Sequence, residues 1–207
     1  LAAYPERPIK VIVPFAPGGG TDLVARTLGV PMSEDLKQSI VIDNKPGGST
    51  IIGTDALAKS PADGYTLVVA TLAHAVNPSL KAKLPYSQDK DFAPVILVGI
   101  SPNVVVVSAD SPYKTFSEFL AAAKANPGTM NYSSGGIGTS AHIAGATFVA
   151  LNNLKITHIP LKGSVEIAAS LLRGDTQFAF PIAGTGVPLV KGGKLRALAV
   201  TSKNRLA

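Results

Sequence analysis

Short β-branched runs alternate with longer stretches of helical spacing along the first half of the chain. Such runs have the composition of strands buried on both faces, and they lie at 11–13, 40–42 and 65–70. Helices are expected at 23–37, with a kink or break at Gly29 and Pro31, and from Ile51 to just before Pro61. Three successive strand–helix units predict a parallel sheet flanked by helices.

The rhythm changes in the middle of the chain. Residues 93–100 and 104–108 both read as strands with no helix between them, so a crossover is expected near 101–103. We therefore predict an α/β protein of two lobes, 1–102 and 103–207, each a mainly parallel sheet flanked by helices. The expected second-lobe elements are a helix from Thr115 to 126–128, strands at 130–133, 156–159, 177–180 and 195–200, and helices at about 140–151, 163–173 and 184–192.

The stretch VIVPFAPGGGTDLVAR at 11–26 organises the first lobe. Pro14 and Pro17 end a strand, three glycines free to adopt positive φ follow, and Thr21 and Asp22 stand where a helix N-cap is expected. Unpaired N–H groups and the positive end of the helix dipole would converge there, which predicts an anion site. The alternative is a plain strand–helix connection, which needs only one glycine.

After the third strand, LAHAVNPSL at 72–80 reads as a loop or short helix.

A second strand–glycine–helix device occupies 133–140, where Ser133, Ser134, Thr139 and Ser140 add hydroxyl groups. Because this strand–glycine–helix arrangement occurs twice, it favours a site in which both loops contact an anionic ligand. The alternative is that the hydroxyl groups only cap a helix. Residues 136–141 fit the GxGxxA dinucleotide pattern, but no acidic residue follows about twenty positions later, so a nucleotide is disfavoured.

Composition excludes several other functions. The net charge is +6, but the basic residues are scattered singly and no aromatic stripe accompanies them, so no nucleic-acid binding is expected. Cysteine is absent, and the three histidines lack metal spacing, so neither a metal nor a cofactor is predicted. His158 is expected to be structural, whereas His74 and His142 lie where either a structural or a ligand-binding role is open.

A candidate site rich in amides and poor in titrating groups favours binding over catalysis. No GxSxG motif is present, and Asp22 is better placed to cap a helix than to act as a general base. An enzyme or binding protein that uses the glycine loops for a phosphorylated ligand or nucleotide remains the alternative.

Six stretches, spread over the whole chain in order, resemble one family: YPERPIKVIVPFAPGGGTDLVAR, NKPGGSTIIGTDALAKSPADGYTLVVAT, HAVNPSL, MNYSSGGIGTSAHIAG, THIPLKG and GGKLRALAVTS. The sequence is similar to the substrate-binding proteins of tripartite tricarboxylate transporters, the Bug-type periplasmic receptors. The resemblance implies a type II-like periplasmic-binding-protein fold that closes on a small mono-, di- or tricarboxylate in the cleft between its lobes. It also implies a monomer in the Gram-negative periplasm, with its signal peptide removed, that delivers the ligand to membrane permease subunits.

The resemblance and the two loops together predict a set of ligand-binding residues. They are Phe15, Ala16, Pro17, Gly18, Gly19, Gly20, Thr21, Thr71, His74, Ser133, Ser134, Gly136, Gly138, Thr139, Ser140, His142 and Pro181.

The sequence departs from the family at three positions. Leu161 stands where the family usually has Tyr, Ile51 where it has Asn, and Pro181 where it often has Asp. Since Pro181 cannot pair with an amine, we expect a plain carboxylate and not an amino acid. Family members continue past residue 207 to complete the first lobe, so a truncated chain is expected, and residues 1–3 would be the remainder of a processed N-terminus.

Overall fold

The computed structural model describes residues 4–206. The chain divides into two compact units, residues 1–96 and 97–207. The boundary suggested by the sequence, between 102 and 103, lies a few residues further along. The expectation of a processed N-terminus concerns residues 1–3, which lie outside the described residues. Among the described helices, none has both the length and the apolar content that a membrane span requires.

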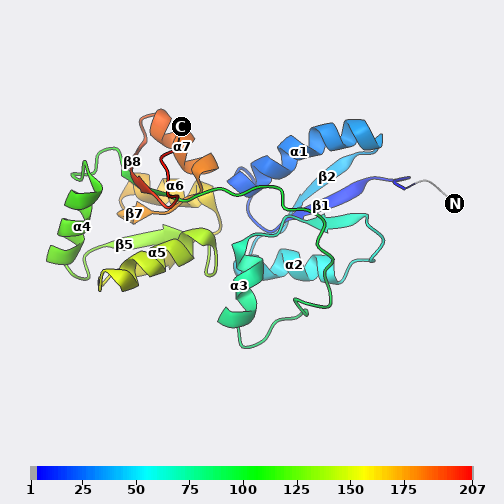
Figure 1. The fold of residues 1–207 in the computed structure, drawn as a ribbon, viewed down its shortest axis with the longest axis horizontal. Helices are drawn as coiled ribbons and strands as arrows, with labels where there is room; N and C mark the ends of the chain where they lie inside the picture. The colour runs from blue at the N-terminus through cyan, green and yellow to red at the C-terminus, as the bar shows by residue number, and fades with distance from the viewer. Residues whose placement is uncertain (1–3, 207) are drawn as a thin grey trace. The chain divides into compact units, whose positions relative to one another are not determined.

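The first unit is built on a fully parallel three-stranded sheet, as the sequence predicted (Figure 1). Its strand order is β2-β1-β3, with β1 (Ile9–Val13), β2 (Ile40–Asn44) and β3 (Thr66–Val68). Its helices are α1 (Gly20–Leu36), the 3-10 turn η1 (Gly48–Thr50), α2 (Ile51–Ala58) and α3 (Leu72–Leu80). Because β1 is the central strand, the loop that follows it emerges at the middle of the sheet's carboxyl edge.

Helix α1 runs continuously through Gly29 and Pro31, so of the expected kink or break, the break is wrong. Gly29 is buried against β2, where an added Cβ would lie 3.4 Å from Ile40 Cγ2. Packing of the helix on the sheet therefore outweighs the local preference of proline to end it.

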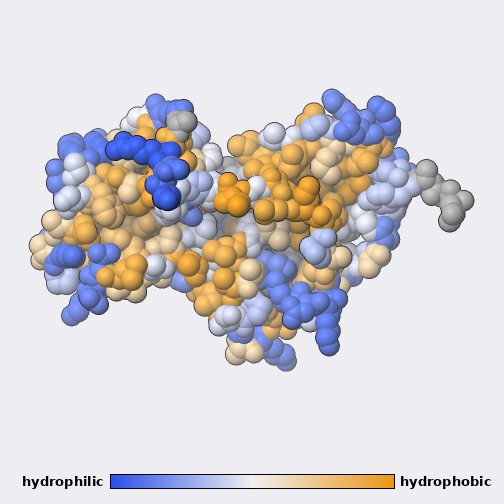
Figure 2. All heavy atoms as spheres, in the orientation of Figure 1, coloured by the Kyte–Doolittle hydropathy of each residue, from blue (hydrophilic) through white to orange (hydrophobic). Residues whose placement is uncertain are grey.

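Residues 93–100, predicted as a strand, form none. The stretch has no regular secondary structure and is exposed, with Ile96 at 80% and Ile100 at 89% of their full accessibility. Figure 2 shows that hydrophobic residues are visible on the face of the molecule drawn there. A strand needs a neighbour to accept its ladder of hydrogen bonds, and no described residue pairs with this stretch. The β-branched composition of residues 93–100 is typical of a strand, but a strand forms only where a neighbouring strand can pair with it.

The second unit contains a five-stranded sheet in the order β6-β5-β7-β4-β8. Strands β5, β6 and β7 are parallel, whereas β4 runs antiparallel to both β7 and β8. The strands are β4 (Val104–Ser108), β5 (Asn131–Ser134), β6 (Thr157–Pro160), β7 (Phe178–Ala179) and β8 (Leu195–Val200). The helices are α4 (Phe116–Ala125), α5 (Ser140–Leu151), α6 (Ser164–Arg173) and α7 (Ala183–Lys191), close to the predicted positions.

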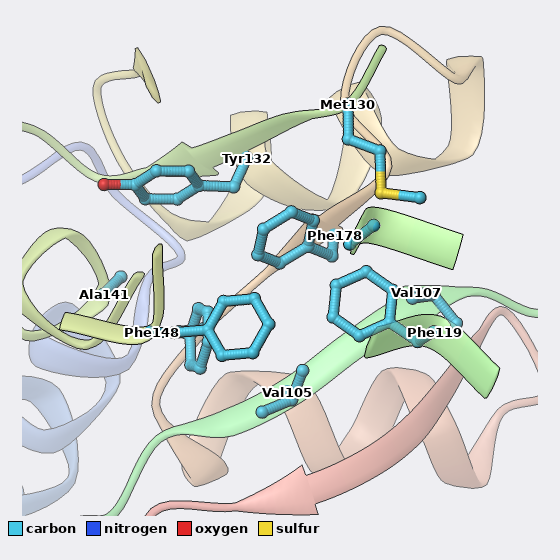
Figure 3. Close-up of a cluster of buried hydrophobic side chains, with 10 residues drawn as sticks. Val105, Val107, Phe119, Met130, Tyr132, Ala141, Phe148 and Phe178 are labelled. Carbon is cyan, nitrogen blue, oxygen red and sulfur yellow. The ribbon is translucent and has the colours of Figure 1, made fainter. Parts of the chain in front are cut away.

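An aromatic core fixes α4 and α5 on this sheet (Figure 3). Phe119 of α4 stacks on Phe148 of α5 with ring centroids 5.7 Å apart, and Phe178 of β7 lies 4.8 Å from Phe119. Helix α4 begins with a capping box in which Thr115 and Glu118 satisfy each other's backbone N–H groups, which confirms the predicted cap at Thr115. The core thereby holds the start of α5 next to the end of β5.

Candidate functional site

The loop between β1 and α1 presents a helix N-terminus without a side-chain cap. Gly19 is the N-cap, with no side-chain cap hydrogen bond, so the expected cap at Thr21–Asp22 is wrong. Of the three glycines only Gly18 has positive φ, at 82°. The first helical bond runs from Leu23 N–H to Gly19 O, at 2.9 Å. The amides of Gly19, Gly20 and Thr21 precede this bond and lie at the positive end of the helix dipole.

Asp22 is buried and fully engaged. Its carboxylate accepts hydrogen bonds, each of 2.9 Å, from Gly18 N–H, Arg26 Nε and Asn44 Nδ2. Burial raises the pKa of Asp22, but the hydrogen bonds from Arg26, Gly18 and Asn44 outweigh it and hold the pKa below its ordinary value. Asp22 is therefore a structural anion and not a free general base.

The loop after β5 is shaped by side chains of β5, β6 and α5. Ser134 is fully buried, and its Oγ accepts a hydrogen bond of 3.1 Å from Gly136 N–H. The same Oγ lies 2.7 Å from His158 Nε2. Gly138 N–H donates to His142 Nδ1 at 3.1 Å, and both glycines have positive φ. The amides of Gly136 and Gly138 are consequently used inside the loop, which fixes its shape.

The first turn of α5 retains free donors. Thr139 is the N-cap: its Oγ1 accepts His142 N–H at 3.3 Å and donates to Gly136 O at 2.7 Å. The amides of Ser140 and Ala141 come before the first helical bond and have no acceptor within residues 4–206. Ser140 Oγ accepts from Asn103 Nδ2 at 3.2 Å, which leaves its hydroxyl hydrogen free to donate.

The other predicted site residues lie at the carboxyl edges of the same two sheets. Strands β1 and β3 are parallel neighbours, so Phe15, Ala16 and Pro17 share one edge with Thr71, the N-cap of α3. Strands β5 and β7 are likewise parallel, so Ser133 shares an edge of the second sheet with Pro181. Pro181 is buried, and its carbonyl oxygen accepts a hydrogen bond of 2.9 Å from Val104 N–H.

His74 lies in the first turn of α3 and packs into an aromatic cluster. Its ring centroid is 4.9 Å from that of Phe92 and 6.4 Å from that of Tyr86. Burial lowers the pKa of His74. Of the two roles left open by the sequence, these contacts are the ones expected of a structural histidine.

Three residues that sequence reasoning did not select shape the loops: Arg26, Asn44 and Asn103. Arg26 stands four residues after Asp22, a spacing typical of a helical ion pair. Asn44 and Asn103 offered no such signal, because their partners lie at least 18 residues away in the sequence.

His142 and His158 form a neutral pair beneath the second loop. Their ring centroids are 4.4 Å apart, and Tyr132 stacks on His158 at 4.7 Å. Burial, helped by the proximity of His142, lowers the pKa of His158 to about 4, and burial also lowers the pKa of His142. Because His142 Nδ1 accepts Gly138 N–H, protonating this nitrogen would break the loop's own hydrogen bond.

Acid is therefore expected to destabilise the second unit. An unfolded His158 takes up a proton near pH 6.5, whereas the folded one does so only near pH 4, so stability is retained above pH 6.5 and falls towards pH 4. One pKa unit corresponds to about 1.4 kcal/mol, and solvent screening of the half-buried ring reduces the total loss to about 1–2 kcal/mol. Urea unfolding at pH 7 and pH 4.5 measures the loss. His158→Gln should show a smaller pH dependence, and an equal dependence in both proteins would contradict the prediction.

Comparisons with known proteins give one consistent family. A protein-family model described as "Tripartite tricarboxylate transporter family receptor" matches residues 24–207. A UPF0065 protein from the tcbD–tcbE intergenic region of Pseudomonas sp. strain P51 is 38% identical over 99% of this chain and 61% of its own length. BugT of Bordetella pertussis is 37% identical over 98% of this chain and 63% of its own length. The chain thus spans less than two thirds of these relatives.

Solved structures agree with the sequence comparisons. A periplasmic transporter is 40% identical, with a TM-score of 0.94 over 99% of this chain and 69% of its own. An R. palustris protein solved with adipate is 33% identical, with a TM-score of 0.95 over 98% of this chain and 68% of its own. MatC from Rhodopseudomonas palustris, solved with bound malate, is 30% identical, with a TM-score of 0.91 over 98% of this chain and 69% of its own.

Proposed function

The chain belongs to the tripartite tricarboxylate transporter receptor family, and we propose that the protein captures a small organic carboxylate and delivers it to the membrane permease subunits of such a transporter. Its α/β fold is that of the periplasmic binding proteins it matches. One observation carries the proposal: the central strand of the first sheet and strand β5 of the second each lead through a glycine loop into a helix with unpaired first-turn amides. Such amides suit carboxylate oxygens.

The ligand is proposed to be a mono-, di- or tricarboxylate without an amine. Adipate and malate, the molecules bound to two structural neighbours, are both dicarboxylates. The predicted ligand residues of the second unit offer neutral donors, namely the Ser140 hydroxyl and the amides of the α5 first turn. Pro181, at the end of β7, has no charge with which to hold an ammonium group.

We propose further that the protein works as a monomer in the periplasm without cofactor, metal or nucleic acid, and that it does not catalyse a reaction. Asp22, buried and bound by three donors, is unsuited to proton transfer. His142 is already an acceptor for Gly138 within the loop. Within residues 4–206 the two glycine loops therefore offer donors for an anion, while the Asp22 carboxylate and His142 Nδ1 are already engaged in hydrogen bonds.

A thermal-shift screen tests the proposal. Malate and adipate are compared with aspartate, which adds an amine, and with phosphate and ATP, which represent the phosphorylated-ligand alternative. A ligand present at a hundred times its dissociation constant stabilises the folded state by about 2.7 kcal/mol. We expect a clear shift with at least one dicarboxylate and none with ATP, and calorimetry should return a one-to-one complex. A shift with ATP or phosphate alone would refute the proposal.

A further inference from the structure

Asp22 presents a difficulty for a carboxylate site in the first unit. It is the third residue of α1, and its side chain is only 4% exposed. A formal negative charge thus lies within the same helical turn whose amides are proposed to bind an anion. Uncompensated, that charge would repel the ligand, and weak screening by solvent would make the repulsion stronger.

Two side chains compensate the charge by forming a closed triangle with Asp22. Arg26 Nε donates to Asp22 Oδ2 at 2.9 Å, and a terminal nitrogen of Arg26 donates to Asn44 Oδ1 at 3.0 Å. Asn44 Nδ2 completes the triangle by donating to Asp22 Oδ1 at 2.9 Å. The guanidinium neutralises the carboxylate, and the amide of Asn44 at the end of β2 orients both.

The triangle also fixes the glycine loop. Asn44 Nδ2 makes a second hydrogen bond, of 3.1 Å, to Phe15 O at the start of the loop. Asp22 Oδ2 accepts Gly18 N–H at 2.9 Å in its middle. The start of the loop, its one glycine with positive φ and the first turn of α1 are therefore linked through the same three side chains.

We propose that Arg26 and Asn44 are positioning residues for the carboxylate-binding loop of the first unit. Arg26 cancels the charge of Asp22, and Asn44 ties the loop to β2, so that the first-turn amides of α1 face an anion in a fixed and locally neutral setting. Neither residue is assigned a contact with the ligand. The inference rests on the proposed function and deepens it by naming what makes the first loop competent to bind.

Two variants of Arg26, one neutral and one still cationic, test the proposal. Arg26→Gln removes the charge and Arg26→Lys retains it. Lys59→Gln is a matched control, because Lys59 pairs with Asp55 at the same i,i+4 spacing, 2.6 Å apart, on α2. By calorimetry with malate and adipate, Arg26→Gln should weaken binding about tenfold, whereas the other two variants should remain within about threefold of wild type. Equal affinities of the Gln and Lys variants of Arg26 would overturn the charge role.

A ligand-free measurement separates this inference from the proposed function. In NMR experiments, Arg26→Gln and Asn44→Ala should each speed hydrogen exchange of the Gly18 amide at least about tenfold, because the carboxylate that accepts it loses an anchor. Arg26→Gln should also raise the pKa of Asp22, whereas Arg26→Lys and Lys59→Gln should not. If wild type binds no carboxylate, the proposed function fails and the exchange data alone decide. Gly18 exchange as slow as in wild type, in both Arg26→Gln and Asn44→Ala, would overturn the inference.

Discussion

Gly145→Ala is expected to destabilise the second unit by about 2 kcal/mol, since overpacking a well-filled core typically costs about 1–3 kcal/mol. Gly145 lies inside α5 with its Cα against the ring of Tyr132 of β5. An added Cβ would lie 2.6 Å from Tyr132 Cδ2 and nearer still to Cε2. Tyr132 is only 2% exposed and is held between His158 and Phe178, at centroid distances of 4.7 and 5.7 Å, so its ring has no room to move away.

The expected loss appears as a drop of about 10 °C in the melting temperature of the second unit. Gly184→Ala is the matched control: Gly184 also lies in a helix, α7, but nothing lies within 4 Å of its added Cβ. Alanine there should stabilise by up to about 1 kcal/mol, because it lowers the entropy of the unfolded chain and has the better helix propensity. Calorimetric melting of both variants decides the matter, and a Gly145→Ala protein as stable as wild type would show that Tyr132 is free to move.

The expected cost of Gly145→Ala also bears on the site. The contact with Gly145 places α5 close to β5, and the second glycine loop joins these two elements. A helix displaced by the alanine would carry Ser140 away from Asn103. Weakened carboxylate binding in this variant would therefore follow from packing and not from a lost contact with the ligand.

Much of the fold was predictable because its signals are local. The β-branched runs of β1, β2 and β4, the threonine before α4 and the two glycine loops are each readable within a few residues. The α/β class and the parallel sheet follow from their order. Two of the errors arose where distant parts of the chain decide the outcome: packing on β2 keeps α1 continuous past Pro31, and residues 93–100 lack a pairing partner among the described residues.

The positions of the two candidate loops were predictable, but their internal hydrogen bonds were not. The glycines and hydroxyls mark both loops in the sequence, and the structure places them at strand ends as expected. The sequence did not reveal that Gly18, Gly136 and Gly138 direct their amides to side chains of the helices and the strand that adjoin their loops. It did not reveal Asn44 or Asn103 either, since an asparagine at a strand end has many possible partners and only the fold selects one.

Ser140→Pro is expected to weaken carboxylate binding about ten- to a hundredfold more than Ser140→Ala does, because a hydrogen bond to a charged group is worth about 1.5–3 kcal/mol. Ser140 is the first residue of α5, where proline is well tolerated, and the extended backbone of Thr139, with ψ of 159°, suits a residue before proline. Both variants lose the hydroxyl and its bond with Asn103 Nδ2. Only Ser140→Pro also loses the backbone N–H.

The ratio of the two affinities therefore isolates a single amide at the helix N-terminus. Calorimetry with malate and adipate measures that ratio, and circular dichroism with thermal melting verifies that both variants keep the fold. Thr185→Ala, in the first turn of α7, removes a hydroxyl that donates to Ile182 O at 3.1 Å, and it serves as a control expected to leave affinity unchanged. Equal binding by Ser140→Ala and Ser140→Pro would mean that this amide does not hold the carboxylate. The carboxylate would then have to be held in the second unit by the Ala141 amide or by side chains.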